Sequence, residues 1–379
     1  MEHIIKYYPV GNADCALVKL ANGKTILIDC CFREITKDDK GNPTIYDVKA
    51  DLLSELRKKN GHPYVDLFVS THPHEDHIIG FEKHLYCGKP EDYDEEKDAE
   101  KIIIGELWVT PKTLTNDVAE KLSCLRKEAK RRRKLYDDNA QYVGDYGNYL
   151  HIIGYDKDKE FDKRYGYVPG QIVEKINGGN LQWLEIFIHA PFKEDVETSK
   201  DKDDKNIISI VMQFGFKIED VKDIVCKAIF AGDAEHPVWT HILENNTDKD
   251  RLKWNILLAP HHCSWTFFNS TSNKDEIVEA ANKILTDYQI GSNAHIIASS
   301  EEIKDNENEP PCYKAMKKYK GKLKNESNFF CTAITNKDEK SIPKPVVYVI
   351  GRFGKLLKTD TVKSSESIVS RPAPRAGLW

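Results

Sequence analysis

The stretch Thr71-His72-Pro73-His74-Glu75-Asp76-His77 decides both the fold and the chemistry of this chain. Within six consecutive positions it places four side chains of the kinds that bind metals: His72, His74, Asp76 and His77. A packed core has no reason to contain such a density of polar groups. The preceding run, Val65-Asp66-Leu67-Phe68-Val69-Ser70, is short, apolar and β-branched, which predicts a buried strand. Ligands usually bind at the carboxyl ends of strands in open α/β sheets, so we expect a site here.

The spacing of these side chains predicts two metal ions. Imidazole and carboxylate groups suit zinc and related divalent ions. Alternate positions at a strand end let His72 and His74 face one ion, and Asp76 and His77 can then address a second. We expect zinc at both positions, with manganese as the alternative.

Two later segments add ligand-type residues after apolar strands. Ile229-Phe230-Ala231-Gly232-Asp233 places a carboxylate after a glycine, where the backbone can approach another group closely. A Gly-Asp turn alone is a weak signal. Pro260-His261-His262-Cys263-Ser264 is a stronger one, because adjacent histidines at a strand end are seldom packing residues.

The rest of the chain has the pattern of an α/β protein. Asn22-Gly23 between two apolar runs predicts a hairpin, and apolar residues at helical spacing predict a helix over 47–59. A charged helix is predicted over 115–135. Further strands are predicted over 102–109, 183–189, 207–216, 227–231, 255–259, 294–299 and 346–350.

In this order, the motifs resemble the metallo-β-lactamase superfamily, with its His-x-His-x-Asp-His sequence, a later Gly-Asp and a final His. Within it, the chain is similar to the hydrolase domain of the competence protein ComEC and to that domain's free-standing relatives. The segments that carry this resemblance are Gly11-Asn12-Ala13-Asp14, Leu27-Ile28-Asp29, Asn206-Ile207-Ile208-Ser209, Ala231-Gly232-Asp233 and Ala259-Pro260-His261-His262-Cys263-Ser264. The chain departs from the family at Cys31 and Cys263, where glycine is usual.

The resemblance implies an αββα sandwich with a helical and loop insertion. It predicts one hydrolase domain over 1–358, with the insertion at about 81–180, followed by a flexible tail over 359–379. The ligands that it implies are His72 and His74 for the first metal, Asp76, His77 and His262 for the second, and Asp233 as the bridge between them. His261 would face the substrate. The third ligand of the first metal stays open between His189 and the region of Asn206.

Composition excludes several classes of protein. A formal net charge of -5 and a pI near 6.3 give no global signature for nucleic acid or anionic membranes. No apolar run approaches the roughly 20 residues that cross a bilayer, and the chain starts without a signal-peptide pattern. Nine cysteines without paired spacing fit a reducing compartment. We therefore expect a cytoplasmic protein without membrane association.

One cationic run interrupts the acidic composition. Lys130-Arg131-Arg132-Arg133-Lys134 is either the solvated face of a helix or a local contact for a phosphate backbone. The second reading would supply the binding patch that the chain otherwise lacks.

The resulting functional hypothesis is a metal-dependent hydrolase, a phosphodiesterase or nuclease that uses a hydroxide activated by two metals. Asp76 would orient the attacking group, and His261 would protonate the departing oxygen. The substrate would be a phosphodiester, with nucleic acid among the candidates. The resemblance also suggests a role in a bacterial defence or nucleic-acid-processing system. The alternatives are a lactone or thioester hydrolase, and an accessory subunit that binds a protein partner through the insertion or the tail.

Overall fold

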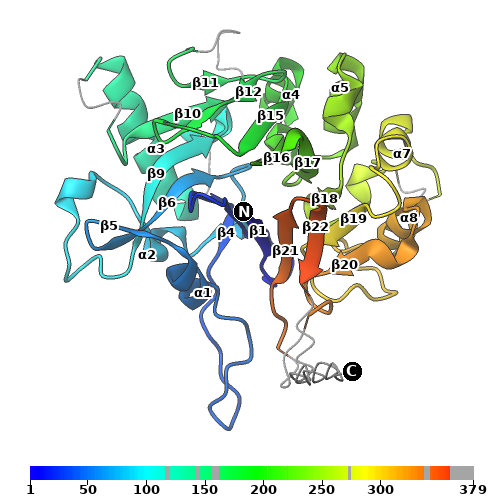
Figure 1. Ribbon diagram of the computed structural model, residues 1–379, viewed down its shortest axis with the longest axis horizontal. Coiled ribbons are helices and arrows are strands. Elements are labelled where there is room, and N and C mark those ends of the chain that lie inside the picture. Colours follow the sequence, from blue (N-terminus) through cyan, green and yellow to red (C-terminus); the bar gives the residue numbers. More distant parts are fainter. Residues whose placement is uncertain are drawn as a thin grey trace, which may run out of the picture.

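The computed structural model describes residues 1–115, 120–140, 145–154, 162–202, 204–219, 221–271, 275–336 and 342–358. Within these ranges the chain is a mixed α/β protein with two large mixed sheets and eight α-helices (Figure 1). The predicted α/β class is therefore confirmed. The tail predicted over 359–379 lies outside the described residues.

The first sheet has eleven strands, and its main path runs β11-β10-β9-β6-β3-β2-β1-β21-β22. The strands of this path are β11 (Gly166–Tyr167), β10 (Tyr149–Ile153), β9 (Ile102–Val109), β6 (His62–Val69), β3 (Thr25–Ile28), β2 (Ala16–Lys19), β1 (His3–Tyr7), β21 (Val346–Gly351) and β22 (Gly354–Lys358). β5 (Lys58–Lys59) pairs with β6, and β8 (Leu85–Tyr86) pairs with β9. From β11 to β3 the neighbouring strands are parallel, and from β3 to β22 they are antiparallel.

The second sheet has seven strands in the order β12-β15-β16-β17-β18-β19-β20. These strands are β12 (Ile172–Val173), β15 (Leu184–Ala190), β16 (Val211–Ile218), β17 (Val221–Phe230), β18 (Ile256–Leu258), β19 (His295–Ala298) and β20 (Phe329–Cys331). From β17 to β20 they are parallel, so β17 and β18 end at the same edge. Two small ladders remain, β13 (Lys175–Ile176) with β14 (Gly179–Asn180), and β4 (Cys30–Cys31) with β7 (Ile78–Ile79).

Helices connect the strands and cover the sheets. The α-helices are α1 (Val48–Glu55), α2 (Phe81–His84), α3 (Ser123–Asp137), α4 (Lys193–Lys202), α5 (His236–Asn245), α6 (Pro260–Cys263), α7 (Glu279–Thr286) and α8 (Tyr313–Lys322). The short 3-10 turns are η1 (Glu75–His77), η2 (Pro90–Asp92), η3 (Pro111–Leu114), η4 (Glu120–Leu122), η5 (Asn206–Ile208), η6 (Lys249–Leu252), η7 (Trp265–Phe267) and η8 (Glu326–Asn328).

A single hydrophobic core joins the facing sides of the two sheets. Ile5 and Tyr7 of β1 belong to it, as do Met212, Phe214 and Phe216 of β16, and all five are at most 1% exposed. Because side chains alternate along a strand, one face of each sheet enters this core. Each fully buried phenylalanine contributes about 1.5–3 kcal/mol to folding.

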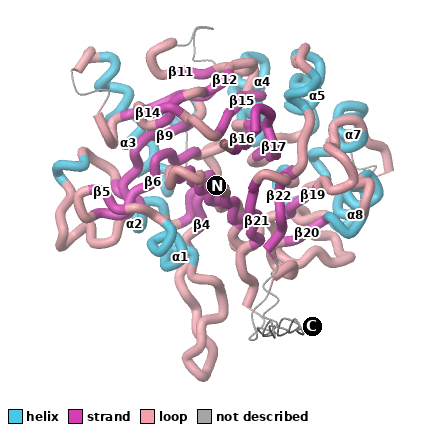
Figure 2. The backbone as a smooth tube through the Cα atoms, viewed as in Figure 1, coloured by secondary structure: helices cyan, strands magenta, loops and turns pink. Residues whose placement is uncertain are grey.

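The outer face of each sheet carries its own helices (Figure 2). Leu52 of α1 and Ala129 of α3 pack in one cluster with Phe68 of the first sheet. Trp239 of α5 and Ile284 of α7 belong to another cluster, on the second sheet. The segment 81–180, which we predict to be an insertion, supplies β9 and β10 to the first sheet and α3 to its outer face.

The helix predicted over 47–59 is shorter in the structure, where α1 ends at Glu55. Asp47 caps its start by accepting from the Ala50 N–H at 2.9 Å. Its end is set by Asn60-Gly61, whose positive φ values of 53° and 90° turn the chain so that β5 pairs with β6. Asn-Gly favours a tight hairpin turn, and this preference overrides helix propensity.

The cationic run is not the continuous exposed patch that either reading assumed. Arg132 is 1% exposed, and its guanidinium donates to Glu128 at 2.6 Å and to backbone carbonyls of the first sheet at 2.9–3.2 Å. Arg131 donates to the same carboxylate at 2.7 Å, and Lys134 pairs with Asp138 at 2.8 Å. Two of the five cations therefore brace α3 against the protein.

Within the described residues, no helix is both long enough and apolar enough to span a membrane. All nine cysteines are free thiols, and most of them are buried.

Candidate metal centre

The histidine-rich segment follows directly from β6. After Val69 the chain leaves the sheet, and Glu75, Asp76 and His77 form the short turn η1. His72 and His77 are fully buried, whereas His74 and Asp76 are partly exposed. The segment 72–77 therefore places two imidazoles, of His72 and His77, inside the protein and the side chains of His74 and Asp76 nearer its surface.

The other groups come from the ends of β17 and β18 in the second sheet. Asp233 follows β17 and Gly232, which has a φ of 49°. His261 and His262 follow β18. The His261 N–H donates to the Gly232 carbonyl at 3.0 Å, which joins the two loops. Parallel pairing of β17 and β18 thus brings residues 233 and 262 to the same place.

Asp76, His77, Asp233 and His262 offer four ligand atoms that lie within 4.8 Å of one another. His77 Nε2 lies 3.1 Å from Asp233 Oδ1 and 3.8 Å from Asp76 Oδ2. His262 Nε2 lies 3.2 Å from Asp76 Oδ2 and 3.6 Å from Asp233 Oδ1. Ligands of a tetrahedral zinc ion, at about 2.0–2.1 Å from it, are about 3.3–3.4 Å apart. The spacing of this set suits such an ion.

His72, His74 and Asp233 form a second set within the same limit. His72 Nε2 lies 3.0 Å from His74 Nδ1 and 3.5 Å from Asp233 Oδ2. Asp233 therefore faces the first set with Oδ1 and this set with Oδ2. All six residues predicted to be ligands are brought together, and the predicted bridging residue lies between the two halves.

Two buried atoms at this place lack the partners that buried polar groups normally have. Within the described part of the chain, neither His77 Nε2 nor Asp233 Oδ1 has a hydrogen-bond partner, although they face each other at 3.1 Å. A cation between them would satisfy both. The donor atoms present therefore fit a divalent ion.

A second layer of residues orients the two buried ligands. Asp29 Oδ2 accepts from His77 Nδ1 at 2.7 Å and from the Thr71 hydroxyl at 2.7 Å. His262 Nδ1 donates to the Ser299 carbonyl at 3.1 Å, and Asp14 lies 3.7 Å from the same nitrogen. Each ring thus keeps its Nε2 directed at the cluster.

The charges in the two sets differ. Burial opposes protonation, but the carboxylates of Asp233, Asp14 and Asp76 raise the pKa of His262 to about 10, and those of Asp233 and Asp29 raise the pKa of His77 well above its usual value. Burial and the nearby charge of His77 lower the pKa of His72 to about 3, and burial also lowers the pKa of His74. Without metal, the Asp76 side of the centre therefore contains imidazolium groups, whereas His72 and His74 are neutral.

These charge states predict that the two positions lose metal at different pH. At pH 7 a metal ion must displace about two protons, from His77 and His262, to bind at the Asp76 side, because only neutral imidazole is a ligand. His72 and His74 present no such competition. For a centre that binds two ions, we expect acidification from pH 8 to pH 6 to release the ion on the Asp76 side first, so that about one ion per chain remains. Elemental analysis after dialysis at each pH measures this, and joint loss of both ions at one pH would contradict it.

Replacing Asp29 by Asn is expected to weaken metal binding by about 10- to 100-fold, because His77 loses the carboxylate that fixes its ring. Asp66→Asn is the matched control. Asp66 is also a buried carboxylate, 4% exposed, but it accepts from the Thr25 N–H and from Arg57, away from the cluster. The Asp66→Asn variant should have a lower free energy of unfolding and an unchanged metal affinity. Equal metal affinities for both variants, measured by competition with a chromogenic chelator, would show that Asp29 has no such role.

The loop after β18 has an unusual backbone. His261, His262 and Cys263 have φ values of 51°, 53° and 69°, in the left-handed region that costs non-glycine residues about 1–3 kcal/mol. Cys263 therefore has a conformation that glycine adopts more easily than other residues. Cys31 shows no positive φ and lies in β4.

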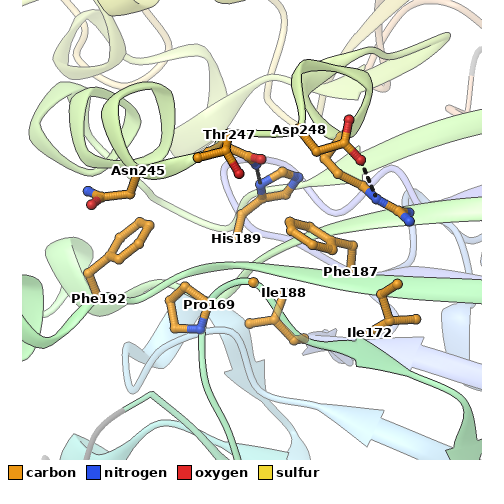
Figure 3. A pocket seen from close by; sticks show the side chains of 12 residues that line it. Pro169, Ile172, Phe187, Ile188, His189, Phe192, Asn245, Thr247 and Asp248 are labelled. Atoms are coloured by element: carbon orange, nitrogen blue, oxygen red, sulfur yellow. Dashed lines mark hydrogen bonds and ion pairs between the residues drawn. The ribbon is translucent and has the colours of Figure 1, made fainter.

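His189, one of the two candidates for the missing ligand, belongs to neither set. Its Nδ1 accepts from the Asn246 side chain at 3.3 Å, and its ring meets Phe187 edge to face at 4.8 Å. Figure 3 shows it in a different pocket, of about 330 Å³, between Phe187 and Phe192. Burial lowers its pKa to about 3, so it is a neutral, packed histidine.

Asn206, the other candidate, is connected to the centre through Glu235. Its Nδ2 donates to Glu235 at 3.2 Å, and Glu235 lies 3.7 Å from His261 Nδ1. Its side-chain oxygen is buried without a hydrogen-bond partner among the described residues. Asn206 therefore supports His261 through Glu235.

His261 stands beside the cluster, as expected of a residue that faces the substrate. Its side chain is 19% exposed, its Nε2 lies 3.6 Å from Asp233 Oδ2, and its Nδ1 contacts the Thr266 hydroxyl at 3.1 Å. Sequence reasoning missed Glu235 and Thr266. Nothing in the local pattern marks them, because they matter only through the fold that carries them to His261.

Comparison with models of known protein families and with curated proteins finds no match. The ligand geometry is therefore the basis for the functional argument that follows.

Proposed function

We propose that this chain is a two-metal hydrolase that cleaves phosphodiesters, built on a metallo-β-lactamase αββα sandwich. The observation that carries the proposal is the sharing of Asp233 between two ligand sets, with one carboxylate oxygen toward each. Two-metal sites with ions about 3.5–4 Å apart are typical of phosphatases and nucleases. The layers of the fold, helices outside two face-to-face sheets, are also those of the sandwich.

Zinc is the ion that these ligands favour. The set contains four imidazoles and two carboxylates, a mixture that suits zinc, with manganese as the alternative. When bound, the ions would lower the pKa of a water molecule and neutralise charge on the substrate's oxygens.

The residues around the ions have distinct tasks in this proposal. Asp76, with a side chain 37% exposed, reaches the surface of the centre and would orient the attacking water. His261, held by Thr266 and flanked by Glu235, stands on the other side of Asp233 and would donate a proton to the departing oxygen. Buried Asp29 and Ser299 keep the rings of His77 and His262 in place.

The proposal is tested by metal content and metal-dependent hydrolysis. Purified protein is expected to contain about two divalent ions and to hydrolyse bis(p-nitrophenyl) phosphate. A chelator should remove both properties, and zinc or manganese should restore them.

Two results would contradict the proposal. One is a metal content near zero after metal-replete purification of folded protein. The other is metal-dependent cleavage of p-nitrophenyl acetate or a lactone with no cleavage of any phosphodiester, which would favour the ester-hydrolase alternative.

A further inference from the structure

A cavity of about 650 Å³ opens beside the proposed metal centre. Its lining includes Asp76, a ligand of the centre, together with the apolar side chains of Ile78, Ile79 and Phe81. The volume is in the range that holds a small organic molecule. An organic group attached to a phosphate at the metals would therefore lie next to these residues.

The charged residues of this cavity are mainly acidic. Glu75, Asp76 and Glu82 contribute carboxylates to its lining. The one cation of the lining, Lys83, pairs with Glu34 at 3.0 Å. A second phosphate placed in the cavity would thus face carboxylates. The ammonium group of Lys83, the one cation of the lining, is already paired with Glu34.

The segment 301–310, which approaches the N-terminal loop, is acidic as well. Glu301 donates its backbone N–H to Asn12 at 3.0 Å, and the Asn12 amide donates to the Pro310 carbonyl at 3.3 Å. These contacts hold the segment 301–310 near the loop that contains Asp14. Five carboxylates lie in that segment against a single lysine: Glu301, Glu302, Asp305, Glu307 and Glu309, with Lys304.

Two cations of the described residues, Arg33 and Lys205, lie near the centre. Arg33 packs over the backbone of Gly11, where a β-carbon would come within 3.0 Å of the guanidinium. The charge of Lys205 helps to lower the pKa of His74. Together with two metal ions, these groups suit one phosphate. Two of the five cations of the run in α3, Arg131 and Arg132, are engaged within the fold.

We propose that the substrate is a small phosphodiester whose organic group, bound in the cavity beside Asp76, carries no second negative charge. This rests on the proposed function. It selects small diesters over nucleic-acid chains, because each further phosphate would be placed against the acidic walls.

Two chromogenic substrates that differ by one phosphate test this selectivity. They are the p-nitrophenyl ester of thymidine 5′-phosphate and the same compound with a 3′-phosphate. We expect kcat/KM to be higher for the first by on the order of fivefold or more at low ionic strength, and the ratio to shrink as salt is added. A single-stranded oligothymidylate should be cleaved more slowly still.

Charge variants of the cavity locate the effect. Glu82→Gln should reduce the ratio, and Glu82→Lys should reduce it further or reverse it. Glu96→Gln is the matched control, since Glu96 is exposed and outside the cavity lining, and it should leave the ratio unchanged. An unchanged ratio in Glu82→Lys, or faster cleavage of the 3′-phosphorylated compound by the unaltered protein, would overturn the inference alone. Failure of the metal-loaded protein to cleave any phosphodiester would overturn the proposed function and this inference with it.

Discussion

Replacing Asp233 by Ala is expected to lower the rate of phosphodiester hydrolysis by roughly a thousandfold or more, the scale on which removal of a central catalytic group acts in other hydrolases. The reason is geometric. Asp233 Oδ2 lies 3.5 Å from His72 Nε2, and its Oδ1 lies 3.1 Å from His77 Nε2, so one side chain completes both ligand sets. Its loss leaves each ion one ligand short, and metal content should fall from about two toward zero.

His189→Ala is the control for this experiment. Like Asp233, His189 is a buried ligand-type residue near the end of a strand, but it lies in the separate pocket of Figure 3. We expect this variant to keep its two metal ions and its activity, with some loss of thermal stability. Metal content by elemental analysis and kcat/KM for bis(p-nitrophenyl) phosphate decide the matter. If Asp233→Ala retained both ions, a different residue would have to bridge them.

Replacing Arg132 by Met should cost about 3 kcal/mol or more of the free energy of unfolding. The substitution leaves the Glu128 carboxylate, 2% exposed, with one of its two arginine partners, and it removes the hydrogen bonds that Arg132 donates to three backbone carbonyls. Breaking a buried ion pair from one side is costly because the remaining charge stays buried. Chemical denaturation measures the change.

Lys134→Met, in the same cationic run, provides the comparison. Lys134 is exposed and pairs with Asp138 at the surface, so its removal should leave the denaturation midpoint almost unchanged. Similar midpoints for the two variants would contradict the internal role of Arg132. A variant in which the whole run is neutralised would thus report on folding before it reported on nucleic-acid binding.

Much of the centre could be predicted because its ligands stand in short local motifs at strand ends. His72, His74, Asp76 and His77 follow one apolar run, and Asp233 and His262 follow two others. The strand ends themselves were predictable from short β-branched runs. What joins them is the parallel pairing of β17 with β18 and the packing of the two sheets, and neither is a local property.

The role of Arg132 could have been recognised in part. The buried residues of α3 recur at spacings of three and four, and this stripe includes Glu128 and Arg132, four positions apart and opposite in charge. Such a pair within an apolar stripe indicates an internal ion pair. Because the five cations are consecutive, they suggest a single patch in the sequence, although their positions around the helix differ.

The sequence alone could not decide whether Asn206 or His189 is the third ligand of the first metal. Both are polar residues near strand ends, and a histidine is the better ligand by chemistry. The structure distinguishes them by direction, because His189 turns toward Phe187 and Asn246, whereas Asn206 contacts Glu235 beside His261.

In the first sheet, a strand from the start of the chain pairs with a strand from near its end, so the first of the two is synthesised long before its partner. β1 pairs with β21, and the residues opposite one another include Tyr7 and Val346. At about 5 to 20 residues per second, a ribosome needs on the order of 20 to 70 seconds to make the intervening polypeptide. Throughout that time the free side of β1 exposes backbone groups that can pair with a strand of another nascent chain. His72 likewise emerges well before Asp233 and His262, so the full candidate ligand set can assemble only late in synthesis.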